Sequence, residues 1–241
     1  MLKQMIALNS PLKPDLNKLT PYLEKINERG WFTNFGPLHD ELTEKLKEYL
    51  GVKHLLLVSN GTVALQLAGR ALEVDNILTT PFSFVATSGA FRWQKDTLSF
   101  SDIDRQSYNL CPKAAELALE QDLALNAIVA THVYGNPCDV KRFEGLGLKK
   151  NIKIIYDAAH SFGVNVGGQS VLNYGDASAL SFHATKVFNT IEGGAVVFKE
   201  QACYEKAKDM INFGIKKGEG IVETGINGKL NEYQAAVGLV I

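Results

Sequence analysis

Three positions in this sequence carry groups that could act together in one reaction. Lys186 stands in the run SFHATK, where an amine can form a Schiff base with an aldehyde once burial lowers its pKa. Asp157 follows the apolar run KIIY, and a buried carboxylate there is costly unless a cation or hydrogen-bond donors compensate it. Gly61-Thr62 follow another apolar run, where the start of a helix would offer unpaired N–H groups to a phosphate.

Each of these residues also has an ordinary structural interpretation. A lysine is usually a solvated surface residue, Asp157 could be the N-cap of a helix formed by AAHSF, and Asn60-Gly61 could be a plain turn. Together, a phosphate site, a carboxylate for a protonated pyridine nitrogen and a lysine are what pyridoxal 5′-phosphate requires. The sequence has neither G-x-G-x-x-G after a strand nor G-x-x-x-x-G-K-[ST], which are typical of nucleotide sites. The combination predicts pyridoxal 5′-phosphate as the cofactor.

The elements that would position these residues alternate regularly. Short, nearly continuous apolar runs predict strands, and helical patterns lie between them, so the sequence predicts one three-layer α/β domain with a largely parallel sheet. The expected strands span residues 54–59, 76–81, 97–103, 126–133, 153–159, 177–183 and 194–199, and the expected helices span residues 38–50, 62–72, 84–94, 112–121, 139–149 and 200–213. In such a sheet the ligand lies beyond the carboxyl ends of the strands. The glycine-rich stretch 215–229 is expected to be a long loop.

The composition excludes several classes of partner. The 25 basic and 26 acidic residues leave a formal charge of −1 without runs of like charge, so neither nucleic acid nor an anionic membrane is an expected partner. The three cysteines are scattered, the histidines lack metal-ligand spacing, and no apolar stretch has the length of a signal peptide or a membrane span. These features predict a protein of the reducing cytoplasm that binds a small ligand and has no metal site.

Five motifs resemble, in order, those of the DegT/DnrJ/StrS-type nucleotide-sugar aminotransferases. They are VSNGTVALQLA (58–68), TTPFSFVATSGA (79–90), YDAAHSFG (156–163), GDASALSFHATKVFNTIEGGAVV (175–197) and NGKLNEYQAAVGL (227–239). The resemblance covers most of the chain. It implies the PLP-dependent transferase fold type I, which is the aspartate aminotransferase fold, and a homodimer with active sites at the interface.

The resemblance also gives a role to each candidate site residue. Lys186 matches the Schiff-base lysine, and Asp157 matches the partner of the pyridine nitrogen. The other cofactor-binding positions are His160 near the phenolic oxygen, Phe84 stacked on the ring, Gly61, Thr62 and Ser181 at the phosphate, and Asn227 at the phosphate of the neighbouring subunit. Without the resemblance, Phe84 would be expected in the core.

The implied activity is transfer of an amino group from glutamate to a nucleotide-linked keto-deoxy sugar, such as a 4-keto-6-deoxyhexose, in polysaccharide or O-antigen biosynthesis. Lys186 would act as the general acid and base. Lysine at this position argues against the dehydratase branch of the family, which has histidine there. The stretch GWFTNFGPL (30–38) resembles the loop near the sugar, although Trp31 and Phe32 are equally expected as core or interface aromatics.

Two departures from the family pattern leave other functions open. The family commonly has an aromatic residue and an arginine after the asparagine, where this chain has Gly228-Lys229. The chain also stops at Ile241, inside the QAAVGLV motif, so residues 1–241 are expected to be the large domain, with the small C-terminal domain absent or truncated. The alternatives are a non-catalytic remnant of such an enzyme, or another fold type I enzyme that acts on amino acids.

Overall fold

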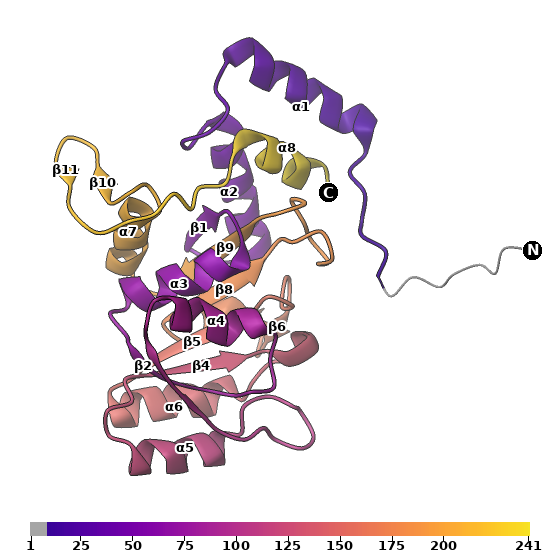
Figure 1. Cartoon of the computed structure of the whole chain (residues 1–241). Coiled ribbons are helices and arrows are strands. Elements are labelled where there is room, and N and C mark those ends of the chain that lie inside the picture. Colours follow the sequence, from indigo (N-terminus) through magenta and orange to yellow (C-terminus); the bar gives the residue numbers. More distant parts are fainter. Residues whose placement is uncertain (1–8) are drawn as a thin grey trace, which may run out of the picture.

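The computed structural model describes residues 9–241, in which a seven-stranded mixed sheet lies between two layers of helices (Figure 1). The strands are β1 (His54–Val58), β2 (Asn76–Thr79), β3 (Thr97–Phe100), β4 (Ala127–Thr131), β5 (Lys153–Asp157), β8 (Ala177–Ser181) and β9 (Gly194–Phe198). Their order is β1-β9-β8-β5-β4-β2-β3, and β9 is antiparallel to both neighbours while the other pairs are parallel. The expected strands and the largely parallel sheet are confirmed. Residues 1–8, where no signal peptide was expected, lie outside the described residues.

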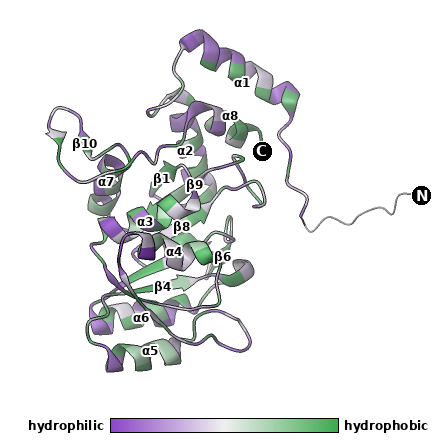
Figure 2. Ribbon diagram, viewed as in Figure 1, coloured by the Kyte–Doolittle hydropathy of each residue, from purple (hydrophilic) through white to green (hydrophobic). Residues whose placement is uncertain are grey.

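Helices cover both faces of the sheet, and each face buries its own hydrophobic core. The helices are α1 (Leu16–Arg29), α2 (Pro37–Leu50), α3 (Gly61–Ala71), α4 (Val85–Trp93), α5 (Pro112–Gln121), α6 (Val140–Lys150), α7 (Gln201–Met210) and α8 (Glu232–Val240). Helices α3, α4 and α7 pack on one face, and the other five pack on the opposite face. Because successive strand residues point to opposite faces, Leu56 and Leu57 of β1 enter different cores. Figure 2 shows the resulting apolar strands between helices of mixed polarity.

Two segments differ from the sequence-based expectation. Residues 16–29, for which no element was predicted, form α1, which contains Pro21 and buries only Leu19 and Ile26. The stretch 215–229, expected to be a long loop, contains the two-stranded hairpin β10 (Ile215–Lys216) and β11 (Gly220–Ile221), which projects from the body of the domain in Figure 1. Gly218 and Gly220 adopt positive φ values that let the chain reverse there. A second small hairpin joins β6 (Asn165–Val166) and β7 (Gln169–Ser170), and short 3₁₀ turns span Val133–Gly135 and Val171–Asn173.

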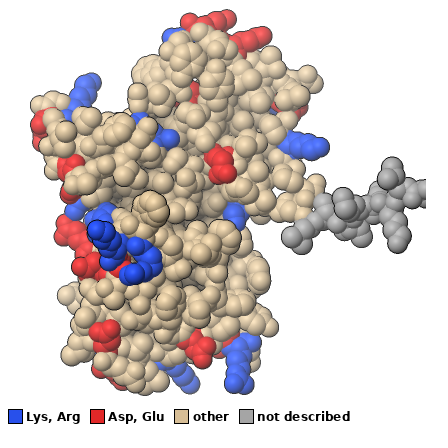
Figure 3. Space-filling view, viewed as in Figure 1, with Lys and Arg blue, Asp and Glu red and all other residues tan. Residues whose placement is uncertain are grey.

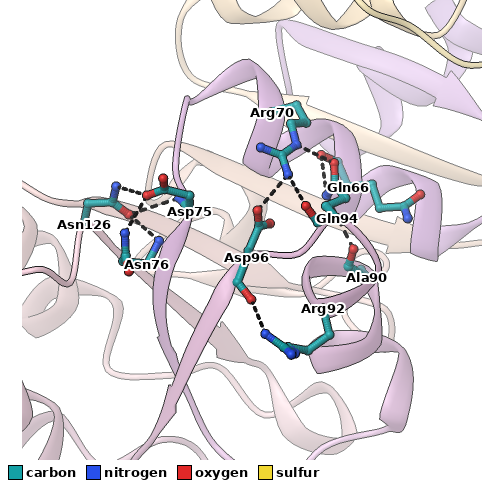
Figure 4. A network of polar contacts seen from close by, with 9 residues as sticks. All are labelled: Gln66, Arg70, Asp75, Asn76, Ala90, Arg92, Gln94, Asp96 and Asn126. Carbon is teal, nitrogen blue, oxygen red and sulfur yellow. Dashed lines mark hydrogen bonds and ion pairs between the residues drawn. The ribbon is translucent and has the colours of Figure 1, made fainter.

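A partly buried polar network fixes α3 against the end of α4 (Figure 4). Arg70 of α3 donates to Asp96 Oδ1 at 2.7 Å, and its guanidinium also donates to the side chain and backbone oxygens of Gln94. Arg92 donates to the backbone oxygen of Asp96 at 2.9 Å. Burial raises the pKa of the Asp96 carboxyl, and the nearby Arg70 opposes that rise. The network holds together the two helices that begin at the edge of the sheet where ligands are expected.

The carboxylate of Glu232 joins α8 to the start of α2. Its side chain is 1 % exposed, and its oxygens accept from the amides of Leu38 at 3.0 Å and His39 at 2.8 Å. The residue before α2 is Gly36, which has no side chain to cap these amides, and a Cβ at that position would collide with Glu232. A negative charge at a helix N-terminus also interacts favourably with the helix dipole.

We expect Glu232→Gln to destabilise the fold by about 2 kcal/mol, because a neutral amide replaces a buried charge that accepts two backbone hydrogen bonds. Urea unfolding of both proteins measures this difference. The matched control is Glu28→Gln on the exposed side of α1, which should change stability by less than about 0.5 kcal/mol. A Glu232→Gln effect as small as that of the control would show that the carboxylate is not needed at the start of α2.

The distribution of charged side chains on the surface agrees with the balanced charge of the sequence. On the face shown in Figure 3, basic side chains lie near acidic ones, and much of the area between them is uncharged. Within the described part of the chain, every helix is too short or too polar to cross a lipid bilayer.

Candidate active site

A cavity of about 520 Å³ lies at the carboxyl ends of the parallel strands, with a size typical of small-molecule sites. Its walls come from the starts of α3 and α4 and from the residues that follow β4, β5 and β8. Of the eight residues predicted for the site, seven line this cavity: Gly61, Thr62, Phe84, Asp157, His160, Ser181 and Lys186. Positions that are up to 125 residues apart in sequence, from 61 to 186, therefore meet where the fold class predicts a ligand.

The start of α3 forms one end of the cavity. Asn60 is the N-cap, and its side chain accepts from the amide of Val63 at 2.9 Å. Within residues 9–241, no acceptor pairs with the amides of Gly61 and Thr62. A Cβ at Gly61 would lie 3.0 Å from the Cβ of Ser181, so the close approach of these two segments needs glycine. Two free amides, a helix dipole and a serine hydroxyl form an arrangement that suits a phosphate group.

Gly193 and Gly194, the glycine pair after the lysine motif, are needed for close packing rather than for ligand binding. A Cβ at Gly194 would lie 2.7 Å from the backbone of both Asn60 and Leu180, and one at Gly193 would collide with the Thr190 hydroxyl. Gly194 begins β9, which runs between β1 and β8. The pair therefore allows the strands below the cavity to pack closely.

Asp157 ends β5 on the floor of the cavity and is 6 % exposed. Its Oδ1 accepts from the amide of Ala159 at 3.1 Å, and its Oδ2 accepts from the Thr87 hydroxyl at 2.6 Å. No helix follows it, so the alternative interpretation of Asp157 as a helix N-cap is wrong. Within the described residues no cation lies within ion-pair distance of this carboxylate. A buried carboxylate without a cation is a fitting partner for a positively charged ligand atom.

Lys186 lies in the turn that follows β8 rather than on the strand itself, and its backbone amide donates to the His183 carbonyl at 2.8 Å. The side chain is half-buried, and in the described chain its amine has no hydrogen-bond or ion-pair partner. Burial lowers the pKa of this amine, while the charge of Asp157 opposes the decrease. A larger fraction of the amine is therefore neutral, and able to act as a nucleophile or base, than in an exposed lysine.

Two aromatic groups complete the walls. Phe84 is 77 % exposed although it is a large apolar residue, so the core position that its apolar character alone would predict, without the family resemblance, is wrong. His160 stacks parallel to Tyr134, with the ring centroids 6.4 Å apart. Burial, followed by the charge of Lys186, lowers the pKa of His160, and Asp157 opposes this effect. An exposed phenylalanine at the edge of an apolar cavity is well placed to contact a flat ligand.

The comparisons with known proteins agree with this geometry. The model of the DegT/DnrJ/EryC1/StrS aminotransferase family matches residues 15–241. The chain belongs to the DegT/DnrJ/EryC1/StrS aminotransferase family. The resemblance seen in the sequence motifs is therefore confirmed.

Two proteins similar to this chain are named dTDP-4-amino-4,6-dideoxy-D-glucose transaminases. The protein from Shigella dysenteriae is 44% identical over 99% of this chain, and the protein from Escherichia coli is 40% identical over 100% of this chain. The chain spans 65% of the length of each of these relatives. A solved structure of DesI with its TDP-sugar product superposes with a TM-score of 0.93 at 32% identity, over 99% of this chain and 61% of DesI. These similarities confirm the predicted fold class.

Three residues that the family resemblance singled out do not line this cavity. Asn227 is exposed and does not line the cavity, although the neighbouring Gly228 accepts a hydrogen bond from the amide of Ser59, just before α3. Trp31 and Phe32 are half-exposed and also lie outside the cavity lining, so neither is a core residue. The cavity of this chain is thus lined by every predicted site residue except Asn227, which was expected to serve the neighbouring subunit.

The structure also adds site residues that the sequence analysis did not identify. They include Asn60, Ser83, His183, Thr185 and Glu192, which line the cavity, and Thr87, which binds Asp157. Ser83 and Thr87 are four residues apart in TTPFSFVATSGA; Ser83 precedes the N-cap Phe84, Thr87 lies in the first turn of α4, and their hydroxyl oxygens are 2.6 Å apart. The spacing of these two hydroxyl residues was the signal in the sequence that could have indicated a polar site before α4. Their partner, Asp157, is too distant in sequence for the spacing to reveal it.

Proposed function

We propose that this chain forms the cofactor-binding domain of a pyridoxal 5′-phosphate-dependent aminotransferase that moves an amino group from glutamate to a nucleotide-linked 4-keto-6-deoxyhexose. The observation that carries the proposal is the meeting of Lys186, Asp157 and the start of α3 in one cavity. The two transaminase relatives support a sugar acceptor, because their names specify an amino-dideoxy sugar linked to dTDP.

The residues of the cavity fit pyridoxal 5′-phosphate at each of its functional groups. The free amides of Gly61 and Thr62, with the Ser181 hydroxyl, would hold the phosphate. Asp157, which lacks a cation among the described residues, would hold the protonated ring nitrogen. The exposed ring of Phe84 would stack on the pyridine, and His160 would lie near its phenolic oxygen.

The bound cofactor supplies an electron-withdrawing ring that stabilises negative charge on the α-carbon of the amino donor. The residues of the chain prepare and use that effect. Lys186 would hold the cofactor through its amine; once the amino donor has displaced that amine, Lys186 would accept the proton from the donor α-carbon and later return a proton to the acceptor carbon. The lowered pKa of Lys186 makes the neutral, proton-accepting form more available. Asp157 would keep the ring nitrogen protonated throughout.

The test is to incubate the protein and pyridoxal 5′-phosphate with glutamate and a panel of nucleotide-linked keto sugars. Formation of 2-oxoglutarate together with an amino sugar supports the proposal, and the panel identifies the nucleotide and the sugar. Reaction of a free amino acid without any keto-sugar acceptor would favour a different fold type I activity. A folded protein that binds no cofactor would instead favour the non-catalytic alternative.

We also propose that two copies of the chain complete each other's sites. Asn227 lies outside its own cavity, in the segment that begins with the projecting hairpin β10–β11, and the family resemblance assigns it to the phosphate of the neighbouring subunit. In a symmetric dimer both segments would exchange reciprocally. Cofactor binding would then be linked to association by mass action.

We expect Asn227→Ala to weaken cofactor binding about tenfold, since one hydrogen bond to a charged phosphate is lost. Absorbance of bound cofactor and sedimentation are measured on the same dilution series. The control is Thr224→Ala, an exposed change in the same segment. A monomer that retains its full complement of cofactor on dilution would contradict the shared site.

A further inference from the structure

The carboxylate of Asp157 is the end point of a chain of three hydroxyl groups. Thr87 Oγ1 lies 2.6 Å from Asp157 Oδ2, and Ser83 Oγ lies 2.6 Å from Thr87 Oγ1. Thr131 Oγ1 lies 3.0 Å from Ser83 Oγ. Ser83 and Thr87 stand at the start of α4, and Thr131 is the register partner of Asp157 on the neighbouring strand β4. This series of hydrogen-bonded hydroxyl groups therefore connects α4, β4 and β5, which meet at the cavity.

The chemistry of the groups sets the direction of every hydrogen bond in this chain. An ionised carboxylate only accepts hydrogen bonds, so Thr87 must donate its single hydroxyl proton to Asp157. The lone pairs of Thr87 can then accept from Ser83, and those of Ser83 can accept from Thr131. All three hydroxyl dipoles thus point toward the carboxylate, and aligned hydrogen bonds of this kind strengthen one another in a buried environment.

The hydroxyl groups of Ser83, just before α4, and of Thr87, in its first turn, do not bond to the backbone of that helix. Ser and Thr at a helix start usually cap backbone amides, or bond to the carbonyl four residues earlier. The N-cap of α4 is Phe84, which provides no side-chain hydrogen bond, and the Thr87 hydroxyl contacts Asp157 instead. Thr87 is 1 % exposed, so its hydroxyl would be costly without this partner. The start of α4 is therefore fastened to Asp157 rather than to its own backbone.

We propose that Thr87 is a positioning residue for the cofactor: its hydroxyl, supported by Ser83 and Thr131, fixes the rotation of the Asp157 carboxylate and ties it to the first turn of α4. Phe84 projects from that turn into the cavity. With Oδ2 bound to Thr87 and Oδ1 bound to the Ala159 amide, the remaining lone pairs have a defined orientation. One hydroxyl thus sets the relative positions of the ring-nitrogen partner and the stacking aromatic. This inference rests on the proposed function.

The first test compares Thr87→Val with Thr87→Ser in cofactor binding. Valine keeps the branched shape and removes the hydroxyl, whereas serine keeps the hydroxyl and removes the methyl group. We expect pyridoxal 5′-phosphate to bind about tenfold more weakly to Thr87→Val, with a shifted absorption spectrum, and within about threefold of wild type to Thr87→Ser. The control is Ser88→Ala on the same helix, where the hydroxyl makes only a solvent-exposed hydrogen bond to the Val85 carbonyl. Wild-type binding and spectrum in Thr87→Val, or equal impairment in Thr87→Ser, would overturn the proposal.

The second test needs no cofactor. A double-mutant cycle of Thr87→Val and Asp157→Ala, measured by urea unfolding of the cofactor-free chain, isolates the interaction between the two side chains. We expect a coupling of about tenfold in the unfolding equilibrium, about 1.4 kcal/mol. Additive effects would overturn the hydroxyl link while leaving the proposed function intact. A wild-type chain that binds no pyridoxal 5′-phosphate, even with coupled residues, would overturn the proposed function and the positioning role with it.

Discussion

Replacing Lys186 with alanine is expected to lower the rate of amino-group transfer by at least about 10³-fold. The amine of Lys186 is half-buried in the cavity, has no partner among residues 9–241, and has a pKa lowered by burial. A positioned general base accounts for factors of about 10² to 10⁴, and the same amine would attach the cofactor. Single-turnover reaction with glutamate measures the loss. Lys199→Ala, an exposed change just after β9, is the matched control and should leave the rate unchanged.

The same residue can be identified without measuring activity. Borohydride reduction of the cofactor-loaded protein fixes the cofactor on the amine that holds it, and peptide mapping then locates the label. We expect the label on Lys186, because it is the lysine that lines the cavity beside Asp157. A label on any other lysine would show that the assignment is wrong, even if Lys186→Ala were inactive for another reason.

Asp157→Asn is expected to slow the half-reaction with glutamate about 10²-fold while leaving cofactor binding measurable. The amide keeps the shape of the side chain and can still bond to Ala159 and Thr87, but it has no charge to hold a proton on the ring nitrogen. Single-turnover absorbance measures the rate. Asp139→Asn caps α6 equally well and serves as the control. A decrease of less than about tenfold, or 1.4 kcal/mol, would mean that Asp157 is not the ring-nitrogen partner.

The sheet could be predicted because most of its strands are buried on both faces, and such strands appear in the sequence as short continuous apolar runs. Residues at the ends of those runs converge by the topology alone, which is why Gly61, Asp157 and Lys186 were found. The helix α1 was missed because Pro21 lies inside it, and a proline within a helical pattern normally indicates the end of a helix. Its packing against α8 stabilises it instead.

Other features of the site depend on contacts that no local pattern records. Phe84 has the apolar side chain of a core residue, and apart from the family resemblance only the fold shows that it lines a cavity rather than the interior. The role of Thr87 depends on a carboxylate 70 residues away in the chain. Hydrophobic periodicity indicates which face of an element is buried, but it does not indicate which polar side chain will be the partner of another.

The position of β9 in the sheet sets the order in which the site can form during synthesis. Strand β1 emerges early from the ribosome, yet within residues 9–241 its one sheet neighbour is β9, and residue 56 pairs with residue 196. The start of α3, which follows β1 directly, contacts Ser181 at the end of β8. The end of the cavity formed by the start of α3 therefore cannot be assembled until the residues of β8 and β9 have been translated. Nascent chains would remain unable to bind the cofactor until that late stage, and non-local pairing of this kind also slows folding.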